Sequence, residues 1–137
     1  MAGQMVIEGV QQMYDAVFLD NATPEDKELI LFSNDEAITD TLVAGDLTEI
    51  TTNGGEKVTL TKASWTAATA ADPVVSVYNT GTGVVFTITG NLTIYGWAVK
   101  GVTSDKIYGA ENFGVKTFVN GNTFTCEPIE LKYDIPE

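Results

Sequence analysis

The stretch that decides the fold is IYGWAVKGVTSDKIYGAENF, residues 94–113. Two runs rich in aromatic and apolar residues flank a central G-V-T-S-D segment at 101–105. Aromatic and β-branched side chains favour extended backbone, whereas Gly, Ser and Asp favour turns. We therefore expect two strands, over residues 92–100 and 106–112, joined by a turn at 101–105.

The first of these strands carries apolar side chains on both faces. Strict alternation places Tyr95, Trp97 and Val99 on one face and Ile94, Gly96 and Ala98 on the other. Such a strand is either central in a layered core or covered on one face by a helix or another subunit. For Trp97 we favour core packing, with the helix expected around Val10 and Val17 as the cover.

The rest of the chain repeats this pattern of short β-rich runs between turn residues. Further strands are expected at residues 28–32, 47–52, 56–61, 74–78, 84–89, 115–119 and 123–126, the last continuing over 129–133 beyond Pro128. Asn and Gly accept the positive φ of tight turns, so Asn53–Gly55 and Asn120–Asn122 predict hairpins between their flanking strands. An acidic loop is expected at 35–46. Pro128 cannot donate to a ladder, which predicts a bulge or an edge there.

Apolar residues near the N-terminus predict an amphipathic helix. Val6, Val10, Met13 and Val17 recur at spacings of three and four, which indicates a helix over residues 5–19. Seven to nine short strands at regular spacing are typical of a sandwich or barrel. We predict a mainly β fold, a sandwich or barrel of antiparallel strands in one domain over residues 1–137. Its N-terminal helix or arm spans 1–22, its strands 27–133 and its tail 134–137.

The charge balance is strongly acidic, with 19 Asp and Glu against 7 Lys and Arg and a net charge of −12. The scattered basic residues and this repulsive field disfavour binding to nucleic acid or an anionic membrane. The N-terminal stretch lacks the basic region of a signal peptide, and no apolar run approaches the ~20 residues that cross a bilayer. Cys126 stands alone, so we expect a buried apolar side chain rather than a disulfide.

The sequence offers few catalytic constellations. It contains no histidine, which excludes Ser-His-Asp and Cys-His arrangements. Ser104 and Lys106 formally allow a Ser-Lys pair, but a solvated lysine in a turn is protonated and a poor base. Glu111 and Glu127 would form a glycosidase pair if held ~5 to 9 Å apart. No calcium-loop or phosphate-binding motif is present, so we expect no catalytic residues, metal or cofactor.

An ordered set of segments resembles a family of small tailed-phage virion proteins. The segments are LILFSN (29–34), DLTE (46–49), KVTLTKASWT (57–66), VFTITGNLTIYGWAV (85–99), IYGAENF (107–113) and VNGNTFTCEP (119–128). Together they cover nearly the whole chain. Members of this family are structural proteins without enzymatic activity, placed on the capsid exterior as decoration or cement proteins, or in tails and fibres. The chain lacks an appended receptor-binding or collagen-like region, which argues against a long fibre.

The resemblance implies an antiparallel, jelly-roll-like β-sandwich. It also implies a virion protein, made in the host cytoplasm and located on the capsid exterior. It implies the major capsid protein or other virion proteins as partners, and a homo-oligomer, of which a trimer at a threefold site is one arrangement. A decoration or cement protein of this kind bridges major capsid subunits and stabilises the shell. The partner-contact residues that we expect are Met5, Val6, Met13, Tyr95, Trp97 and Tyr108.

Two other functions stay open. One is a tail or head-fibre component that binds host surface glycan through exposed aromatic rings. The other, which we favour less, is a polysaccharide depolymerase that uses a pair of carboxylates.

Overall fold

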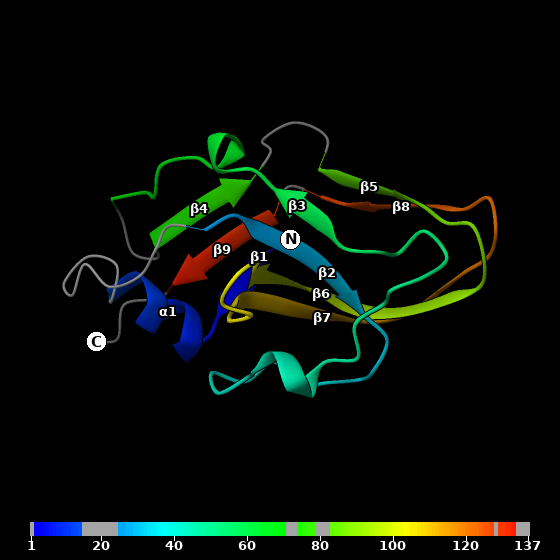
Figure 1. Ribbon diagram of the computed structural model, residues 1–137, viewed down its shortest axis with the longest axis horizontal. Helices are drawn as coiled ribbons and strands as arrows, with labels where there is room; N and C mark the ends of the chain where they lie inside the picture. The colour runs from blue at the N-terminus through cyan, green and yellow to red at the C-terminus, as the bar shows by residue number, and fades with distance from the viewer. Residues whose placement is uncertain (1, 15–24, 71–73, 79–82, 128, 134–137) are drawn as a thin grey trace.

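The computed structural model describes residues 2–14, 25–70, 74–78, 83–127 and 129–133 (Figure 1). Its elements in chain order are β1 (Ala2–Met5), α1 (Ile7–Tyr14), β2 (Lys27–Phe32), β3 (Val58–Leu60), β4 (Val74–Tyr78), β5 (Val84–Thr87), β6 (Leu92–Gly101), β7 (Ile107–Phe118), β8 (Thr123–Cys126) and β9 (Ile129–Tyr133). Short 3₁₀ turns lie at Ala44–Asp46 and Lys62–Ser64. The expectations for residues 15–22, Pro128 and the tail at 134–137 fall outside the described residues.

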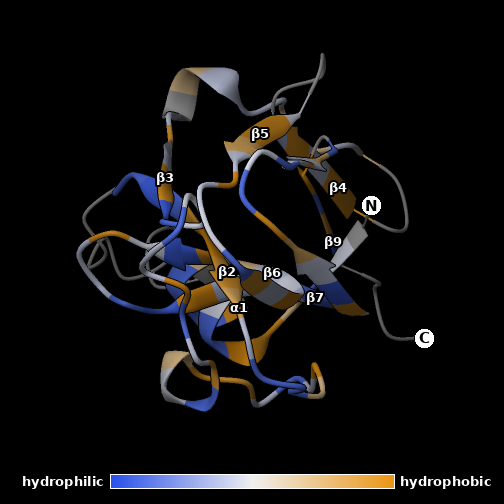
Figure 2. Cartoon of the chain, turned by 90° about the vertical axis from the view of Figure 1, so that its right-hand side faces the viewer, coloured by the Kyte–Doolittle hydropathy of each residue, from blue (hydrophilic) through white to orange (hydrophobic). Residues whose placement is uncertain are grey.

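The strands form a curled seven-stranded sheet, in the order β3-β2-β6-β7-β1-β9-β4, and a two-stranded sheet of β5 and β8. Figure 2 looks at the molecule from one end and shows β5 across the interior from β6 and β7. This arrangement confirms the predicted mainly β, sandwich-like fold with an N-terminal helix. The strand pairs are antiparallel except for β1 and β9, which are parallel.

The two strands of the opening stretch form the centre of the seven-stranded sheet. β6 and β7 are antiparallel and longer than predicted, at 10 and 12 residues. Their register shifts between Ile94, which pairs with Lys116, and Gly96, which pairs with Asn112. β7 therefore carries extra residues at this point, and Gly114 adopts a φ of +85° that most side chains disfavour.

This irregularity reverses the facing of side chains along β6. Ile94 packs in the same cluster as Trp97 and Val99, whereas Tyr95 packs with Ala98 in a second cluster. The prediction that Tyr95 and Trp97 share a face is therefore wrong, because strict alternation does not survive a register shift.

The core consists of two clusters on opposite sides of β6. The larger one lies between the seven-stranded sheet and the β5–β8 sheet and includes Trp97, Phe86, Phe124 and Cys126. The smaller one joins Ala98 and Ala110 to Val6, Leu42 and Leu47. Trp97 is fully buried, so the core packing that we favoured for it is confirmed. The second face of β6 is covered by Val6 and the 38–47 loop rather than by Val10, and Val17 lies outside the described residues.

The N-terminal segment begins as a strand, so the prediction of a helix from residue 5 is wrong. Ala2–Met5 forms β1, and the helix starts at Ile7. β1 inserts between β7 and β9, pairing Met5 with Gly109 and Gly3 with Leu131. A Cβ atom at Gly3 would lie 2.4 Å from the Trp97 ring. Glycine at this position therefore lets the strand pass over the core tryptophan.

The predicted hairpin across Asn53–Gly55 is wrong in its pairing. The turn itself is present, because the Gly55 amide donates to the Thr52 carbonyl at 3.1 Å. The flanking segments do not pair with each other but follow one after the other along the same edge of β2. The Ile50 amide donates to the Leu31 carbonyl at 2.8 Å, and β3 pairs with residues 27–29 of β2.

The predicted hairpin across Asn120–Asn122 is wrong for a related reason. The turn closes with the Asn122 amide donating to the Val119 carbonyl at 3.0 Å. The chain then crosses to the other layer, where β8 pairs with β5 and not with β7. The Phe118 and Phe124 rings meet between the layers with centroids 5.4 Å apart. Burying both rings requires the two strands to face each other across the core.

Candidate functional site

The carboxylate of Glu25 accepts four hydrogen bonds from residues of the β6–β7 turn and the start of β7. It accepts hydrogen bonds from the Thr103 and Ser104 amides, each at 2.9 Å, from Ser104 Oγ at 2.6 Å and from the Tyr108 hydroxyl at 3.2 Å. Burial opposes the charged form, but the bonds from Ser104, Thr103 and Tyr108 outweigh it and lower the pKa of Glu25. We call Glu25, Thr103, Ser104 and Tyr108 the Glu25 network.

The same arrangement shifts the pKa of Tyr108 upward, opposite to the shift of Glu25. Burial, followed by the charge and the hydrogen bond of Glu25, raises the pKa of Tyr108 to about 12. Lys27 Nζ lies 4.9 Å from the centre of the Tyr108 ring. The phenol is therefore a neutral hydrogen-bond donor at physiological pH, and it fixes the carboxylate rather than removing a proton.

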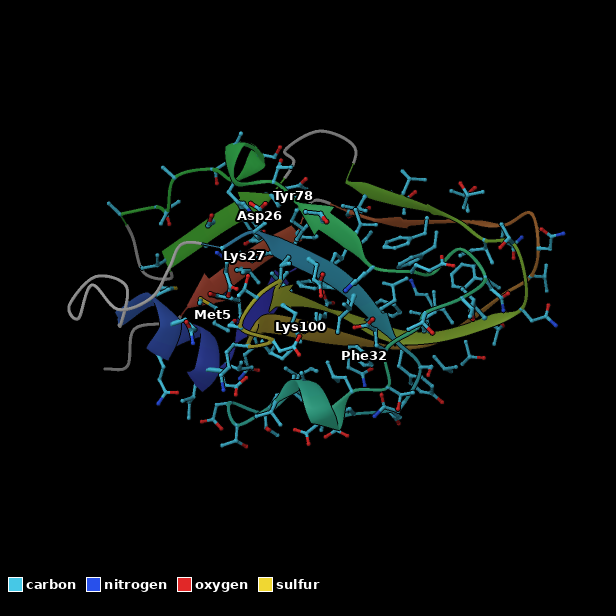
Figure 3. All side chains as sticks on the ribbon, viewed as in Figure 1. Met5, Asp26, Lys27, Phe32, Tyr78 and Lys100 are labelled. Carbon is cyan, nitrogen blue, oxygen red and sulfur yellow. The ribbon has the colours of Figure 1, made fainter. Side chains whose placement is uncertain are left out.

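Lys100 forms a second polar cluster on the strand beside this turn (Figure 3). Its Nζ lies 3.3 Å from Glu28 Oε1, 3.4 Å from Glu49 Oε1 and 3.1 Å from Asp105 Oδ1. Burial would lower the pKa of Lys100, but its bonds to Asp105 and Glu28 raise it overall. The lysine is therefore a fixed cation that neutralises buried acid, and its geometry does not suit a general base.

The Ser104–Lys106 pair does not assemble. Ser104 Oγ donates to Glu25, whereas Lys106 Nζ contacts Glu8 Oε1 at 3.2 Å. Each side chain is held by a different carboxylate, so the lysine is not in place to activate the hydroxyl.

The two acids of the expected glycosidase pair have different environments. Glu111 lies opposite Trp97 on the neighbouring strand, and its Oε2 is buried without a hydrogen-bond partner among the described residues. Burial raises the pKa of Glu111, while a hydrogen bond from Trp97 and the charge of Lys116 partly oppose this effect. Glu127 is exposed, directly after β8. A Glu111–Glu127 pair stays a prediction.

Cys126 is fully buried in the larger cluster, as the sequence predicts. Burial and the nearby Glu111 raise the pKa of its thiol to about 12, so the reactive thiolate is disfavoured. Within the described ranges, no group of three or more His, Cys, Asp or Glu side chains is placed to hold a metal ion. The helices of the described part of the chain include none long and apolar enough to cross a membrane.

The expected partner-contact residues are mostly not at the surface. Val6 and Trp97 are completely buried, and Tyr108 is 9% exposed within the Glu25 network. Met5 and Tyr95 are half-buried, and Met13 is 49% exposed. The chain's own core encloses Val6 and Trp97, and the partner-contact role expected for the six residues stays a prediction. Only Met13 presents a large exposed apolar surface among these residues.

A different surface stands out at the end of the molecule where β5 and β8 lie over β6 and β7, on the right in Figure 1. We call residues 84–94 and 113–126 the tip. Lys116 is the only charged residue in these two segments, and all 19 acidic residues lie elsewhere. The three most exposed large apolar side chains of the described residues are all here: Val115 at 58%, Val119 at 56% and Val85 at 53%.

The tip has two outward faces. On β6 and β7, Leu92, Ile94 and Phe118 point inward, so alternation leaves an outward face formed by Thr93, Val115, Thr117 and Val119. On β5 and β8, the outward pairs are Val85 with Thr125 and Thr87 with Thr123. The Nζ of Lys116 lies 4.8 Å from the Phe113 ring centre and 6.0 Å from that of Phe124, on the inner side. Both outward faces are therefore uncharged.

Reasoning from the sequence missed this surface. The signal was present, since no Asp or Glu occurs in residues 73–104 or 112–126. The sequence does not show that these two acid-free segments form one surface, because only the fold brings them together. Comparisons of the chain with models of protein families, with curated proteins and with solved structures gave no match.

Proposed function

We propose that this protein is a structural component of a phage virion, a capsid decoration protein that bridges major capsid subunits. The observation that carries the proposal is the tip, an end free of acidic residues, with exposed valines and a single charged side chain, Lys116, on a chain of net charge −12. The centres of protein interfaces are depleted of charged residues, and exposed apolar side chains that cluster mark contact sites. The resemblance of the ordered segments to small virion proteins supplies the virion setting.

The rest of the molecule anchors the tip. β6 and β7 pair with each other from the β6–β7 turn to the tip, with register shifts at Ile94/Gly96 and Val99/Lys100. At the other end, the Glu25 network and the Lys100 cluster hold the turn and the edge of β2 in place. A rigid contact surface loses little conformational entropy on binding. The acidic remainder repels the phosphates of packaged nucleic acid.

Stabilisation by this protein would follow mass action. A protein that binds the assembled shell and not its separated subunits stabilises the shell in proportion to occupancy. Stripping the protein from particles should therefore lower the temperature at which the shell opens, and adding it back should restore that temperature.

The direct test is a count of copies per particle by quantitative mass spectrometry, with the major capsid protein of the same particles as the internal standard. A decoration protein is expected at a number comparable to that of the major capsid protein, because it follows the symmetry of the shell. A count that fits only a single tail complex would contradict the proposal. Glycan-array binding and release of reducing sugar would then test the two other functions.

A further inference from the structure

We infer that Asn120 is a site of spontaneous covalent modification, at which the side-chain amide of the free chain is converted to a carboxylate. Two Asn-Gly pairs occur in the sequence, Asn53–Gly54 and Asn120–Gly121. The structure leaves the second pair free to react and holds the first in place. The modification occurs in the isolated chain, and only its consequence for binding rests on the proposed contact role of the tip.

The reaction joins the backbone to the preceding side chain. The Gly121 nitrogen loses its proton and attacks the side-chain carbonyl carbon of Asn120, so that a new C–N bond closes a five-membered imide ring. The C–N bond of the side-chain amide breaks, and its nitrogen takes up a proton and leaves as ammonia. Water then opens the ring and leaves a carboxylate on residue 120, as aspartate or as isoaspartate. Glycine favours the ring closure because it has no Cβ atom to hinder the approach.

The two asparagine side chains differ in how firmly they are held. Nδ2 of Asn53 donates to the Asn91 carbonyl at 3.2 Å. A Cβ atom at Gly90 would lie 2.7 Å from Asn53 Cγ, the atom that would be attacked, so this side chain is also packed. The Asn120 side chain is exposed and makes no hydrogen bond among the described residues. Asn120 can therefore turn its carbonyl carbon towards the following nitrogen, whereas Asn53 would first lose its bond and its packing.

The two turns differ in the same sense. Gly54 lies against the end of β5, where a Cβ atom would overlap the Thr87 carbonyl oxygen. Gly55 is buried, and a Cβ atom there would lie 2.7 Å from Ile50 Cγ2. At Gly121 a Cβ atom would meet nothing within 4 Å, and residues 120–122 are all exposed. The first turn is therefore fastened to the core, whereas the second projects into solvent.

Reaction at Asn120 requires the exposed turn to open. The Gly121 amide donates to the Ile88 carbonyl at 2.9 Å, and the Ile88 amide donates to the Asn122 carbonyl at 2.9 Å. The first of these bonds must break before the Gly121 nitrogen is available. Exposed turns open at a lower free energy than segments fastened to the core. The rate of conversion is therefore set by the fraction of molecules in which this turn is open.

The product changes the charge of the tip. All 19 acidic residues lie outside residues 84–94 and 113–126, so the new carboxylate would be the first negative charge there. It would stand next to Val119, which is 56% exposed. Because the centres of interfaces are depleted of charged residues, copies that have reacted should bind the shell less tightly than fresh copies. The age of the free chain would then limit its use in assembly.

The test is peptide mapping by mass spectrometry after the purified full chain has been incubated at mildly alkaline pH, where backbone amides lose their protons more readily. Trypsin cuts after Lys116 and Lys132 and places Asn120 in a peptide separate from that of Asn53. We expect Asn120 to convert faster than Asn53 by about tenfold or more, because conversion follows local opening. Equal rates in the folded chain, or a folded chain in which neither site converts, would overturn the inference.

The same incubation in urea is the matched control. Unfolding frees both Asn-Gly pairs, so the two sites should then convert at similar rates. A difference that persists in urea would show that neighbouring residues in the sequence, and not the fold, protect Asn53, and it would overturn the structural argument.

Variants separate the chemistry from its consequence. Asn120→Gln should show no conversion at residue 120, because its longer side chain disfavours ring closure, and should bind stripped particles like the wild type. Asn120→Asp carries the product charge from the start, and we expect it to bind at least about tenfold more weakly. Val102→Glu, at a 47% exposed valine outside the tip, is the control for an added charge and should bind normally. Circular dichroism establishes that each variant is folded.

The outcomes are separable from those of the proposed function. Conversion at Asn120 in a chain that does not bind stripped particles supports the modification site and overturns the decoration role. A chain that binds particles but does not convert overturns the site and leaves the decoration role in place. Equal binding of the wild type and Asn120→Asp would overturn the effect of the new charge on the contact.

Discussion

Ser104 Oγ donates a hydrogen bond of 2.6 Å to Glu25, a residue 79 positions earlier in the sequence. This bond ties the β6–β7 turn to the segment that leads into β2. We predict that Ser104→Ala lowers the free energy of unfolding by about 2 kcal/mol at neutral pH, because the buried Glu25 carboxylate loses a hydrogen-bond donor. Urea denaturation measures the change. Thr103→Ala is the control, since Thr103 contributes its backbone amide and its side chain is exposed.

The hydrogen bond between Ser104 and Glu25 also predicts how folding stability depends on pH. The folded-state pKa of Glu25 is lowered from its ordinary value of 4.5. Its stabilisation is therefore present above the pKa of the unfolded chain and is lost as pH falls through the folded-state pKa. The stability difference between wild type and Ser104→Ala should shrink on acidification below pH 4.5. A difference that stays constant through this range would show that the hydroxyl acts independently of the Glu25 charge.

Lys100 and Lys57 both contact Glu28 but differ in burial, which predicts unequal effects. The Lys100 side chain is 11% exposed and that of Lys57 is 54% exposed. Lys100→Met leaves the Glu28 carboxylate, 5% exposed, without its buried partner, and we expect a loss of about 3 kcal/mol. Lys57→Met should cost less than about 1 kcal/mol. Equal losses in thermal and urea denaturation would contradict this assignment.

Glu111 is expected to destabilise the folded chain at neutral pH. Its pKa is raised above its ordinary value, chiefly by burial, and its Oε2 lacks a hydrogen-bond partner within the described part of the chain. A carboxyl whose folded-state pKa is raised favours folding at low pH, and this contribution is lost as pH rises through that pKa. Glu111→Gln should therefore raise the melting temperature at pH 7 more than at pH 4. A uniform shift at both pH values would count against the titration of Glu111.

The raised pKa of Tyr108 predicts that its hydroxyl loses its proton at a higher pH than an ordinary tyrosine does. Its pKa is raised from 10.0 to about 12, so its contribution is complete below pH 10 and is lost as pH rises towards 12. Ultraviolet absorbance should show tyrosinate formation near pH 12 in the folded wild type, and this step should be missing in Tyr108→Phe. The variant should also lose about 1 kcal/mol at neutral pH, since the hydroxyl no longer donates to Glu25.

The position of most strands could be predicted from residue patterns, because alternation and turn residues act locally. The 94–113 stretch gave both central strands and their turn in nearly the observed places. Which strands pair was harder to predict from the sequence, because pairing depends on which distant strand offers a complementary face. The turns at Asn53 and Asn120 were correctly expected, yet β3 pairs with β2 and β8 pairs with β5.

The site was less predictable than the fold for two physical reasons. A register shift between β6 and β7 changed the facing of Tyr95 relative to Trp97, and such shifts are set by the paired strand rather than by the strand itself. Buried and interfacial aromatic residues also look alike in a sequence. Trp97 was therefore expected both as a core residue and as a contact residue. The acid-free segments, in turn, form one surface only because the fold brings β5 to β8 together.

The parallel pairing of β1 with β9 bears on how the chain matures. β1 takes its place only between β7 and β9, so its partners are residues made more than a hundred positions later. During synthesis on the ribosome, β1 cannot pair until β7 and β9 have been made, whereas β2, β3 and β6 are synthesised earlier and can pair with one another sooner. The rate at which newly made molecules reach their final form should then be limited by the late capture of Ala2–Met5.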